Sequence, residues 1–274
     1  MGKIVLGTVQ FGLQYGVNSE GRPTEEGVKE ILRQARLGGI DTLDTSGAYG
    51  NSEEILGRSG TRDFRVVSKY PMGKVPVEEM FRRSLELLKL DSLYGYLLHH
   101  FQVYRDNPAV WDSFMALKES GKVSKIGFSL YEPSELELLL ERDVHFDLLQ
   151  IPFNVLDRKF GPYLKELHAR GVEIHVRSTF LQGLFFMDRE KLPEKLKPLR
   201  KYLLELDAYA SESGLSMAQL ALNANLQNPF IDGVLIGVDN PAQLRANLQA
   251  VSDVKIDVWP EVEEKELLNP VNWK

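Results

Sequence analysis

The segment Leu43-Asp-Thr-Ser-Gly-Ala-Tyr-Gly-Asn-Ser-Glu-Glu-Ile-Leu-Gly57 begins in a predicted strand, Asp41–Thr45, and continues into a loop. Asp44 stands near the C-terminal end of that strand, and Tyr49 follows in the loop immediately after it. A short strand that ends in reactive side chains is one unit of a larger pattern, because similar units recur along the whole chain.

Short runs rich in β-branched residues alternate with amphipathic segments from one end of the sequence to the other. In 77–88 the apolar residues follow the spacing of one buried helix face, and Asn240-Pro241 predicts a helix start with an N-cap and a first-turn proline. The predicted strands are Ile4–Thr8, Asp41–Thr45, Arg65–Tyr70, Gly95–His100, Lys125–Leu130, Leu148–Phe153, Val172–Thr179 and Gly233–Val238.

Eight strands separated by helices indicate parallel βα units, because parallel strands need a crossover connection. The expected fold class is α/β, a single-domain (β/α)₈ TIM barrel over residues 1–274, and this length suits such a barrel. We expect a loop and helix insertion at about 180–232 and a C-terminal tail at 252–274. The pattern alone also permits an open, doubly wound sheet.

Composition narrows the function classes. The absence of cysteine excludes disulfides, thiolate zinc sites and cysteine nucleophiles, and no bound metal is expected. A net charge of −6 with dispersed Lys and Arg disfavours a nucleic-acid partner, and no apolar run reaches membrane-spanning length. The N-terminal apolar run is too short for a signal peptide, so we expect a cytoplasmic protein, as a monomer or weak oligomer.

In (β/α)₈ barrels the chemistry lies at the C-terminal ends of the strands. There, an ammonium from Lys69, held by Asp44, is expected to lower the pKa of Tyr49 and make its proton easier to donate. His99 is expected to orient a carbonyl oxygen by a hydrogen bond. Together these groups would protonate an oxygen while a hydride reaches the carbon, which is general acid catalysis.

The segment 43–57 resembles the signature of the aldo-keto reductase family, in which Asp and Tyr five residues apart precede Gly-x-Ser-Glu. The strand Val66-Val-Ser-Lys69 is similar to the lysine-bearing strand of that family, and Tyr96-Leu-Leu-His99 to its histidine-bearing strand. Similar motifs occur at Gly121–Ser129, at Leu149-Gln150 with Asn154, and from Gly237 to Asn247. The resemblance covers nearly the whole chain and implies NAD(P)H-dependent reduction of a carbonyl by Asp44, Tyr49, Lys69 and His99.

The resemblance also implies a coenzyme site. We add to it two residues that depart from the family pattern, Arg177 and Asp239. Arg177 replaces a stacking aromatic residue. Its guanidinium is suited to lying over a ring, to binding an anionic substrate, or to an ion pair in the barrel mouth. The expected contacts are Thr8, Asp44, Ser129, Gln150, Arg177, Ser178, Gly237, Asp239, Gln243 and Asn247.

NADPH is the expected coenzyme from the family, and NADH is possible because Asp239 would repel a 2′-phosphate and only Arg245 nearby is positive. Adjacent strand residues point to opposite faces, so the motif register assigns the catalytic role to His99 rather than His100. His100 and Phe101 are expected to line the substrate pocket.

The substrate is expected to be a small-molecule aldehyde, ketone or keto-sugar, and the sequence does not choose among these. Two other functions remain open on the same residues. One is an aldolase that forms a Schiff base on Lys69, which requires a desolvated lysine with a lowered pKa. The other is a regulatory barrel that binds the coenzyme with little turnover.

Overall fold

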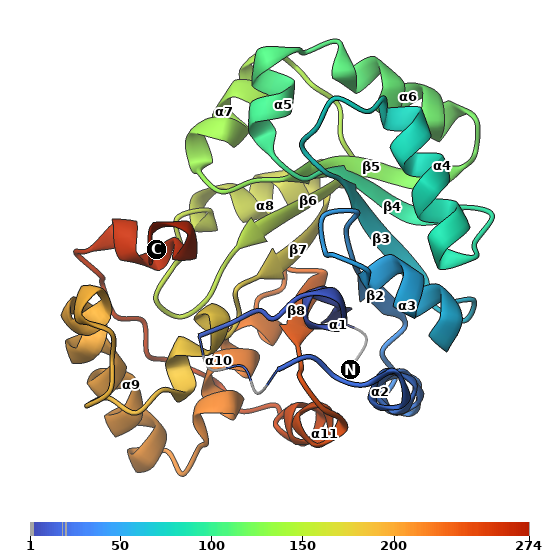
Figure 1. Ribbon diagram of the computed structural model, residues 1–274. Coiled ribbons are helices and arrows are strands. Elements are labelled where there is room, and N and C mark those ends of the chain that lie inside the picture. Colours follow the sequence, from blue (N-terminus) through green and yellow to red (C-terminus); the bar gives the residue numbers. More distant parts are fainter. Residues whose placement is uncertain (1–2, 18, 20, 274) are drawn as a thin grey trace.

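The computed structural model describes residues 3–17, 19 and 21–273; the ends of the predicted domain, 1–2 and 274, lie outside these residues. The described residues form a closed barrel of eight parallel strands in sequential order, which rules out an open sheet. The strands run through the middle of the molecule with helices outside them (Figure 1). They are β1 Ile4–Gly7, β2 Thr42–Asp44, β3 Arg65–Tyr70, β4 Leu93–Leu98, β5 Val123–Ser129, β6 Leu148–Pro152, β7 Glu173–Arg177 and β8 Gly233–Gly237.

All the predicted strands are present, with small differences at their ends. At the C-terminal ends the largest differences are in β4, which ends at Leu98, and in β7, which ends at Arg177. His100 precedes the helix α5 as its N-cap, and Ser178 has a left-handed φ of 64°, so neither residue continues its strand. These two early ends are the points where the chain turns into the loops above the barrel.

The helices that cover the barrel agree with the predicted pattern. The helix predicted at 77–88 is α4. Asn240 caps α11 by accepting a hydrogen bond from the backbone N–H of Gln243. The helices are α1 Val9–Gly12, α2 Glu25–Leu37, α3 Ser52–Ser59, α4 Val77–Leu88, α5 Phe101–Asp106, α6 Val110–Glu119, α7 Pro133–Glu141, α8 Gly161–Ala169, α9 Arg200–Glu212, α10 Met217–Leu226 and α11 Pro241–Gln249. The described residues also form four 3₁₀ helices, η1 Leu181–Phe186, η2 Glu194–Leu199, η3 Lys265–Leu268 and η4 Pro270–Trp273.

The inside of the barrel is filled in layers. A small apolar cluster of Val67, Leu97 and Leu148 occupies its middle. Gly127 makes room for it, since a Cβ atom there would lie 1.6 Å from the carbonyl oxygen of Leu148. Because side chains two residues apart share a face, Lys69 lies above Val67 on the way to the C-terminal end of the barrel.

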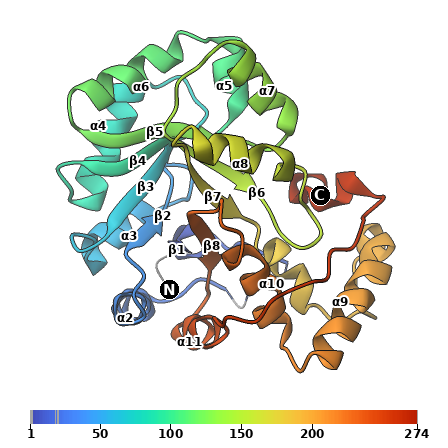
Figure 2. The same cartoon turned by 180° about the vertical axis from the view of Figure 1, so that it is seen from behind.

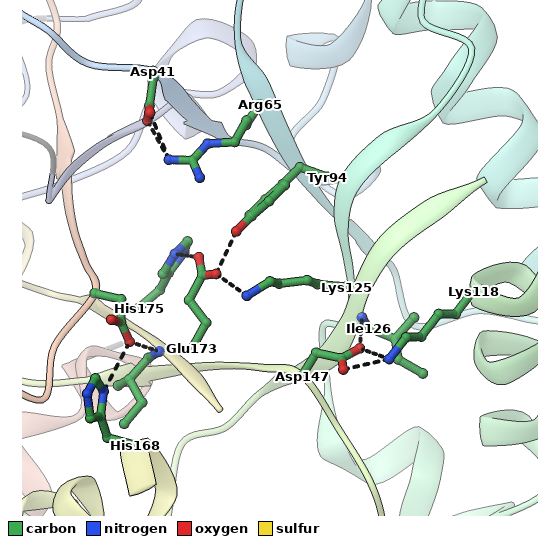
Figure 3. Close-up of polar contacts among 12 residues, drawn as sticks. Asp41, Arg65, Tyr94, Lys118, Lys125, Ile126, Asp147, His168, Glu173 and His175 are labelled. Atoms are coloured by element: carbon green, nitrogen blue, oxygen red, sulfur yellow. Dashed lines mark hydrogen bonds and ion pairs between the residues drawn. The ribbon is translucent and has the colours of Figure 1, made fainter. Parts of the chain in front are cut away.

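A charged cluster closes the opposite, N-terminal end of the barrel (Figure 3). The Glu173 carboxylate accepts hydrogen bonds from Tyr94, Lys125 and His175. The guanidinium of Arg65 stacks on the ring of Tyr94, 4.8 Å from its centroid. These residues lie at or near the starts of their strands, so they shape the barrel end away from the predicted chemistry.

The segment 180–232 contains η1, η2, α9 and α10, and its apolar residues pack with those of the C-terminal tail. Leu203 and Leu206 of α9 belong to the same buried cluster as Ile256 and Leu267. In both views α9 and the C-terminal segment lie together at one side of the barrel (Figure 2). Within the described part of the chain, no helix is long and apolar enough to cross a membrane.

Candidate active site

Asp44, Lys69 and Tyr49 meet at the C-terminal end of the barrel, where the sequence predicted them. The Nζ atom of Lys69, on β3, lies 2.6 Å from Oδ1 of Asp44, on β2. The other carboxylate oxygen of Asp44 accepts a hydrogen bond of 2.7 Å from Gln150 on β6. Strands β2, β3 and β6 thus hold the Asp44 carboxylate between the ammonium of Lys69 and the side-chain amide of Gln150.

Lys69 is completely buried, and its ammonium group uses all three of its protons. Besides Asp44, it donates to the carbonyl oxygen of Thr45 at 2.8 Å and to the hydroxyl oxygen of Tyr49 at 3.5 Å. Burial lowers the pKa of Lys69, and the Asp44 carboxylate opposes this effect. The lysine is therefore fixed in one direction, with one proton aimed at the phenol oxygen.

The pKa of Tyr49 differs from the expected direction. Burial raises it above its usual value, the Asp44 carboxylate and Tyr131 act in the same direction, and Arg177 opposes them. The expectation that Lys69 lowers this pKa is wrong, because Asp44 neutralises the ammonium at 2.6 Å and burial dominates. Tyr49 consequently keeps its proton across the neutral pH range.

His99 and His100 follow β4, and both reach the same cavity. The ring of His99 packs edge-on against Tyr49, with the ring centroids 5.6 Å apart, and its Nδ1 lies 3.1 Å from Oγ of Ser46. Burial, then the charge of Lys69, lowers the pKa of His99 well below its usual value, so the imidazole is neutral. His100 is half-buried beside it, with ring centroids 4.6 Å apart.

A cavity of about 620 Å³ opens above these residues. Asp44, Tyr49 and His99 line it, whereas Lys69 lies behind them and does not. All ten residues that the sequence suggested for a coenzyme also line this cavity. They are Thr8, Asp44, Ser129, Gln150, Arg177, Ser178, Gly237, Asp239, Gln243 and Asn247.

One end of the cavity reaches the N-terminal turn of α11. Gln243 lines it there, Asn247 lines it one turn further along the helix, and the side chain of Gln243 accepts a hydrogen bond from the backbone N–H of Asp239. Asp239 is buried and accepts a hydrogen bond from Ser19 at 3.2 Å. Arg245, the one nearby cation in the sequence, is exposed and does not line the cavity.

Phe101, expected in the substrate pocket, does not line this cavity. It is buried in the core against Tyr104 and Phe128, because it is the first residue of α5 and that helix packs onto the barrel. Of the other aromatic residues in the loops, Tyr15, Tyr131, Phe180 and Phe186 line the cavity.

Sequence reasoning missed Ser46 and Tyr131, which support His99 and Arg177. Ser46 lies inside the quoted segment 43–57, between Asp44 and Tyr49, so its position in that segment was the available signal. Tyr131 follows β5, at the strand end where the family motif was traced only as far as Ser129. An aromatic residue at that place offered no separate signal, because most loop aromatics serve packing.

The chain is similar to known proteins over most of its length. A family model described as the aldo/keto reductase family matches residues 3–266. An uncharacterized oxidoreductase, YqkF of Bacillus subtilis, is 24% identical, covering 92% of each chain. L-glyceraldehyde 3-phosphate reductase of Escherichia coli is 28% identical over 84% of this chain and 80% of its own. A solved aldo-keto reductase from Bacillus halodurans has the same fold, with a TM-score of 0.73, 22% identity, and coverage of 97% and 90%.

Proposed function

The chain belongs to the aldo/keto reductase family, and we propose that it reduces the carbonyl group of a small aldehyde, ketone or keto-sugar with Tyr49 as the general acid. The observation that carries this proposal is the hydrogen bond from the buried Lys69 ammonium to the hydroxyl oxygen of Tyr49, at 3.5 Å. It leaves the phenol proton of a cavity-lining tyrosine available to a substrate oxygen. The small aldehyde named for the Escherichia coli relative agrees with this substrate class.

The family uses a nicotinamide coenzyme, and the cavity suits one. Its volume of about 620 Å³ lies within the range of ligand sites. It runs from Tyr49 to the first turn of α11, and the N-terminus of a helix is a favourable place for phosphate groups. Beside β8, Oε1 of Gln10 is buried and has no hydrogen-bond partner among the described residues, so a donor from a ligand would satisfy it.

When bound, this coenzyme supplies a hydride to the carbonyl carbon. As negative charge then develops on the substrate oxygen, Tyr49 donates its proton to that oxygen. The Lys69 ammonium, hydrogen-bonded to the phenol oxygen, stabilises the tyrosinate that remains. Asp44 keeps the ammonium in place, so the raised pKa of Tyr49 holds the acid in its protonated form until the oxygen needs the proton.

His99 is proposed to orient the carbonyl. The neutral ring has one N–H, and its Nδ1 faces the Oγ of Ser46 at 3.1 Å. Ser46 has one proton, and its Oγ lies 3.4 Å from the carbonyl oxygen of Lys69 and closer to Nδ1. If Ser46 donates to Nδ1, the proton of the imidazole lies on Nε2, which then donates to the substrate oxygen. Two donors, Tyr49 and His99, would thus converge on one oxygen.

We retain NADPH as the expected coenzyme from the family, with a narrow preference over NADH. The residues that line the cavity near α11 include the carboxylate of Asp239 and no lysine or arginine among those described. A carboxylate there disfavours a 2′-phosphate and suits a ribose hydroxyl. The local charge therefore opposes the preference that the family suggests.

The alternative of a Schiff-base aldolase fits this geometry less well. Its lysine must reach the substrate as a free amine. Lys69 does have a lowered pKa, as that alternative requires, but all three of its protons are engaged and it does not line the cavity. A covalent borohydride adduct on Lys69 in the presence of a carbonyl substrate would overturn the reductase proposal.

The decisive experiment compares wild type with Tyr49→Phe. NADPH and NADH are first titrated by fluorescence, and reduction is then measured on a panel of aldehydes, ketones and keto-sugars. We expect the variant to bind the coenzyme like wild type and to reduce carbonyls at least about a hundredfold more slowly. Equal turnover would refute the role of Tyr49. Coenzyme binding without turnover in either protein would favour the regulatory function.

A further inference from the structure

Arg177 is the one lysine or arginine among the described residues that line the cavity. It stands at the C-terminal end of β7, half-buried, and no carboxylate of the described residues lies within ion-pair distance of it. The two acidic residues of the cavity have other contacts: Asp44 pairs with Lys69, and Asp239 accepts from Ser19. A half-buried cation without an ion-pair partner is costly, so its presence calls for an explanation.

The guanidinium is held in place by neutral groups. It lies 4.1 Å from the centroid of the Tyr131 ring, and one of its nitrogens donates to the carbonyl oxygen of Leu130 at 3.0 Å. A guanidinium has five N–H donors in a fixed plane, and this one hydrogen bond leaves most of them without a protein acceptor in the described structure. Stacking on a tyrosine fixes the plane of the group without reducing its charge.

The backbone around Arg177 is equally well fixed. Its carbonyl oxygen accepts a hydrogen bond from Phe153, and the next residue, Ser178, has a φ of 64°. The carbonyl oxygen of Ser178 accepts from the side chain of Asn154 at 3.1 Å. A non-glycine residue in the left-handed region is held by its surroundings, and such strain is concentrated at functional sites. This turn aims the side chain of Arg177 into the cavity.

The cation lies close enough to the reacting groups to act on them. Its charge contributes to lowering the pKa of His99 and of His100, after burial in both cases, and it opposes the raised pKa of Tyr49. His100 is neutral and half-buried in the same cavity, so its ring offers one further N–H beside the guanidinium.

On the basis of the proposed carbonyl reduction, we infer that Arg177, with His100 beside it, is an anion-binding subsite that selects carbonyl substrates bearing a carboxylate or phosphate group. The substrate oxygen would lie at Tyr49 and His99, and the anionic group at the guanidinium, whose fork suits two oxygens at once. The anion would compensate the charge that the described residues leave unpaired. The coenzyme-stacking role considered for Arg177 is the competing explanation.

The test compares matched substrates: succinic semialdehyde with butanal for the carboxylate, and glycolaldehyde phosphate with glycolaldehyde for the phosphate. We expect wild type to have a higher kcat/KM for at least one anionic member of these pairs. Arg177→Met should reduce that preference, the ratio of kcat/KM for the anionic member to kcat/KM for its neutral partner, by about 10- to 100-fold, the effect of losing a hydrogen-bonded charge. Arg177→Lys keeps the charge but loses the planar fork of N–H donors. Its preference for the anionic substrates should therefore lie between that of wild type and that of Arg177→Met.

The matched control is Arg142→Met. Arg142 is exposed, its guanidinium lies over Tyr104 at 6.0 Å, and it does not line the cavity, so this variant makes the same change in net charge elsewhere. It should keep the preference of wild type. Coenzyme dissociation constants are measured for every variant. A weaker coenzyme affinity in Arg177→Met with an unchanged preference would overturn the subsite, and so would the absence of any preference in wild type.

A binding measurement separates failure of the subsite from failure of the proposed function. If neither protein reduces any carbonyl, the proposed function falls, and NMR titration with 4-hydroxybutyrate, 2-hydroxyethyl phosphate and butan-1-ol still tests the subsite. Binding of either anionic alcohol that Arg177→Met weakens at least about tenfold would support it. Equal binding by both proteins, or none, would overturn it.

Discussion

The Oγ atom of Ser46 lies 3.1 Å from Nδ1 of His99, which joins the loop after β2 to the end of β4. Both residues are buried, and Ser46 also accepts a hydrogen bond from the backbone N–H of Ala48. The contact holds Nδ1 of the neutral imidazole against Ser46 and leaves Nε2 as the nitrogen available to a substrate. Ser46 is therefore a positioning residue that acts through His99.

Ser46→Ala should reduce kcat/KM for carbonyl reduction about 2- to 10-fold, because it removes one hydrogen bond that orients His99. We expect the ¹⁵N NMR signals of His99 to show the proton on Nε2 in wild type and shared between the two ring nitrogens in Ser46→Ala. The control is Ser84→Ala, which removes another buried hydroxyl, one that donates to Glu53 away from the cavity. An unchanged tautomer in Ser46→Ala would contradict the role given to Ser46.

Asp44 and Lys69 form a buried ion pair, and breaking it should lower both the stability of the protein and its activity. Asp44→Asn leaves the Lys69 ammonium buried without a counter-charge, and Lys69→Met does the same to the carboxylate, so each should lower the free energy of unfolding by about 3–5 kcal/mol. The double variant should lose less than the sum of the two, as measured by urea unfolding, while reduction remains impaired. Additive losses would show that the pair is not coupled.

The sequence predicted the strands and the meeting of Asp44, Tyr49 and Lys69 because these depend on local pattern and on a known motif. β-branched runs specify strands, and the ends of parallel strands must lie at one edge of the barrel. The same reasoning placed ten coenzyme candidates, all of which line one cavity. Their roles toward a coenzyme remain predictions.

What the sequence could not predict depends on packing in three dimensions. The raised pKa of Tyr49 follows from how deeply the loop buries it, and the stacking of Arg177 on Tyr131 joins residues from two different strand ends. Phe101 was expected in the pocket as an aromatic residue of the loop after the fourth strand, but the start of α5 turns it into the core. No local pattern contains this information.

Asp239→Asn should shift coenzyme preference toward NADPH. The variant removes a negative charge from the cavity near α11 and keeps an oxygen that accepts from Ser19. The ratio of the dissociation constants for NADPH and NADH should fall at least about fivefold, a change of about 1 kcal/mol, in fluorescence titrations. Asp253→Asn, an exposed residue outside the cavity, is the control for net charge. An unchanged ratio would show that Asp239 does not face the 2′ position.

At the N-terminal end of the barrel, the Glu173 carboxylate should make the stability of the protein depend on pH in the acid range. Burial raises its pKa, but hydrogen bonds from His175, Lys125 and Tyr94 outweigh this effect and lower the pKa to about 2 (Figure 3). The carboxylate therefore favours folding at any pH above its ordinary pKa, about 4.5. That contribution is lost as the pH falls from about 4.5 to about 2.

Glu173→Gln should destabilise the protein by roughly 2 kcal/mol at pH 7, since the variant cannot offer a charged acceptor to Lys125 and His175. The difference between wild type and variant should shrink as the pH approaches 3, because the Glu173 carboxyl of the unfolded chain then takes up a proton that the folded protein does not yet bind. Urea unfolding at a series of pH values measures this difference. Glu166→Gln, which breaks an exposed pair with Arg170, should change stability by less than about 1 kcal/mol at pH 7. If the difference for Glu173 stayed constant between pH 7 and pH 3, the ionised carboxylate would not be what stabilises this end of the barrel.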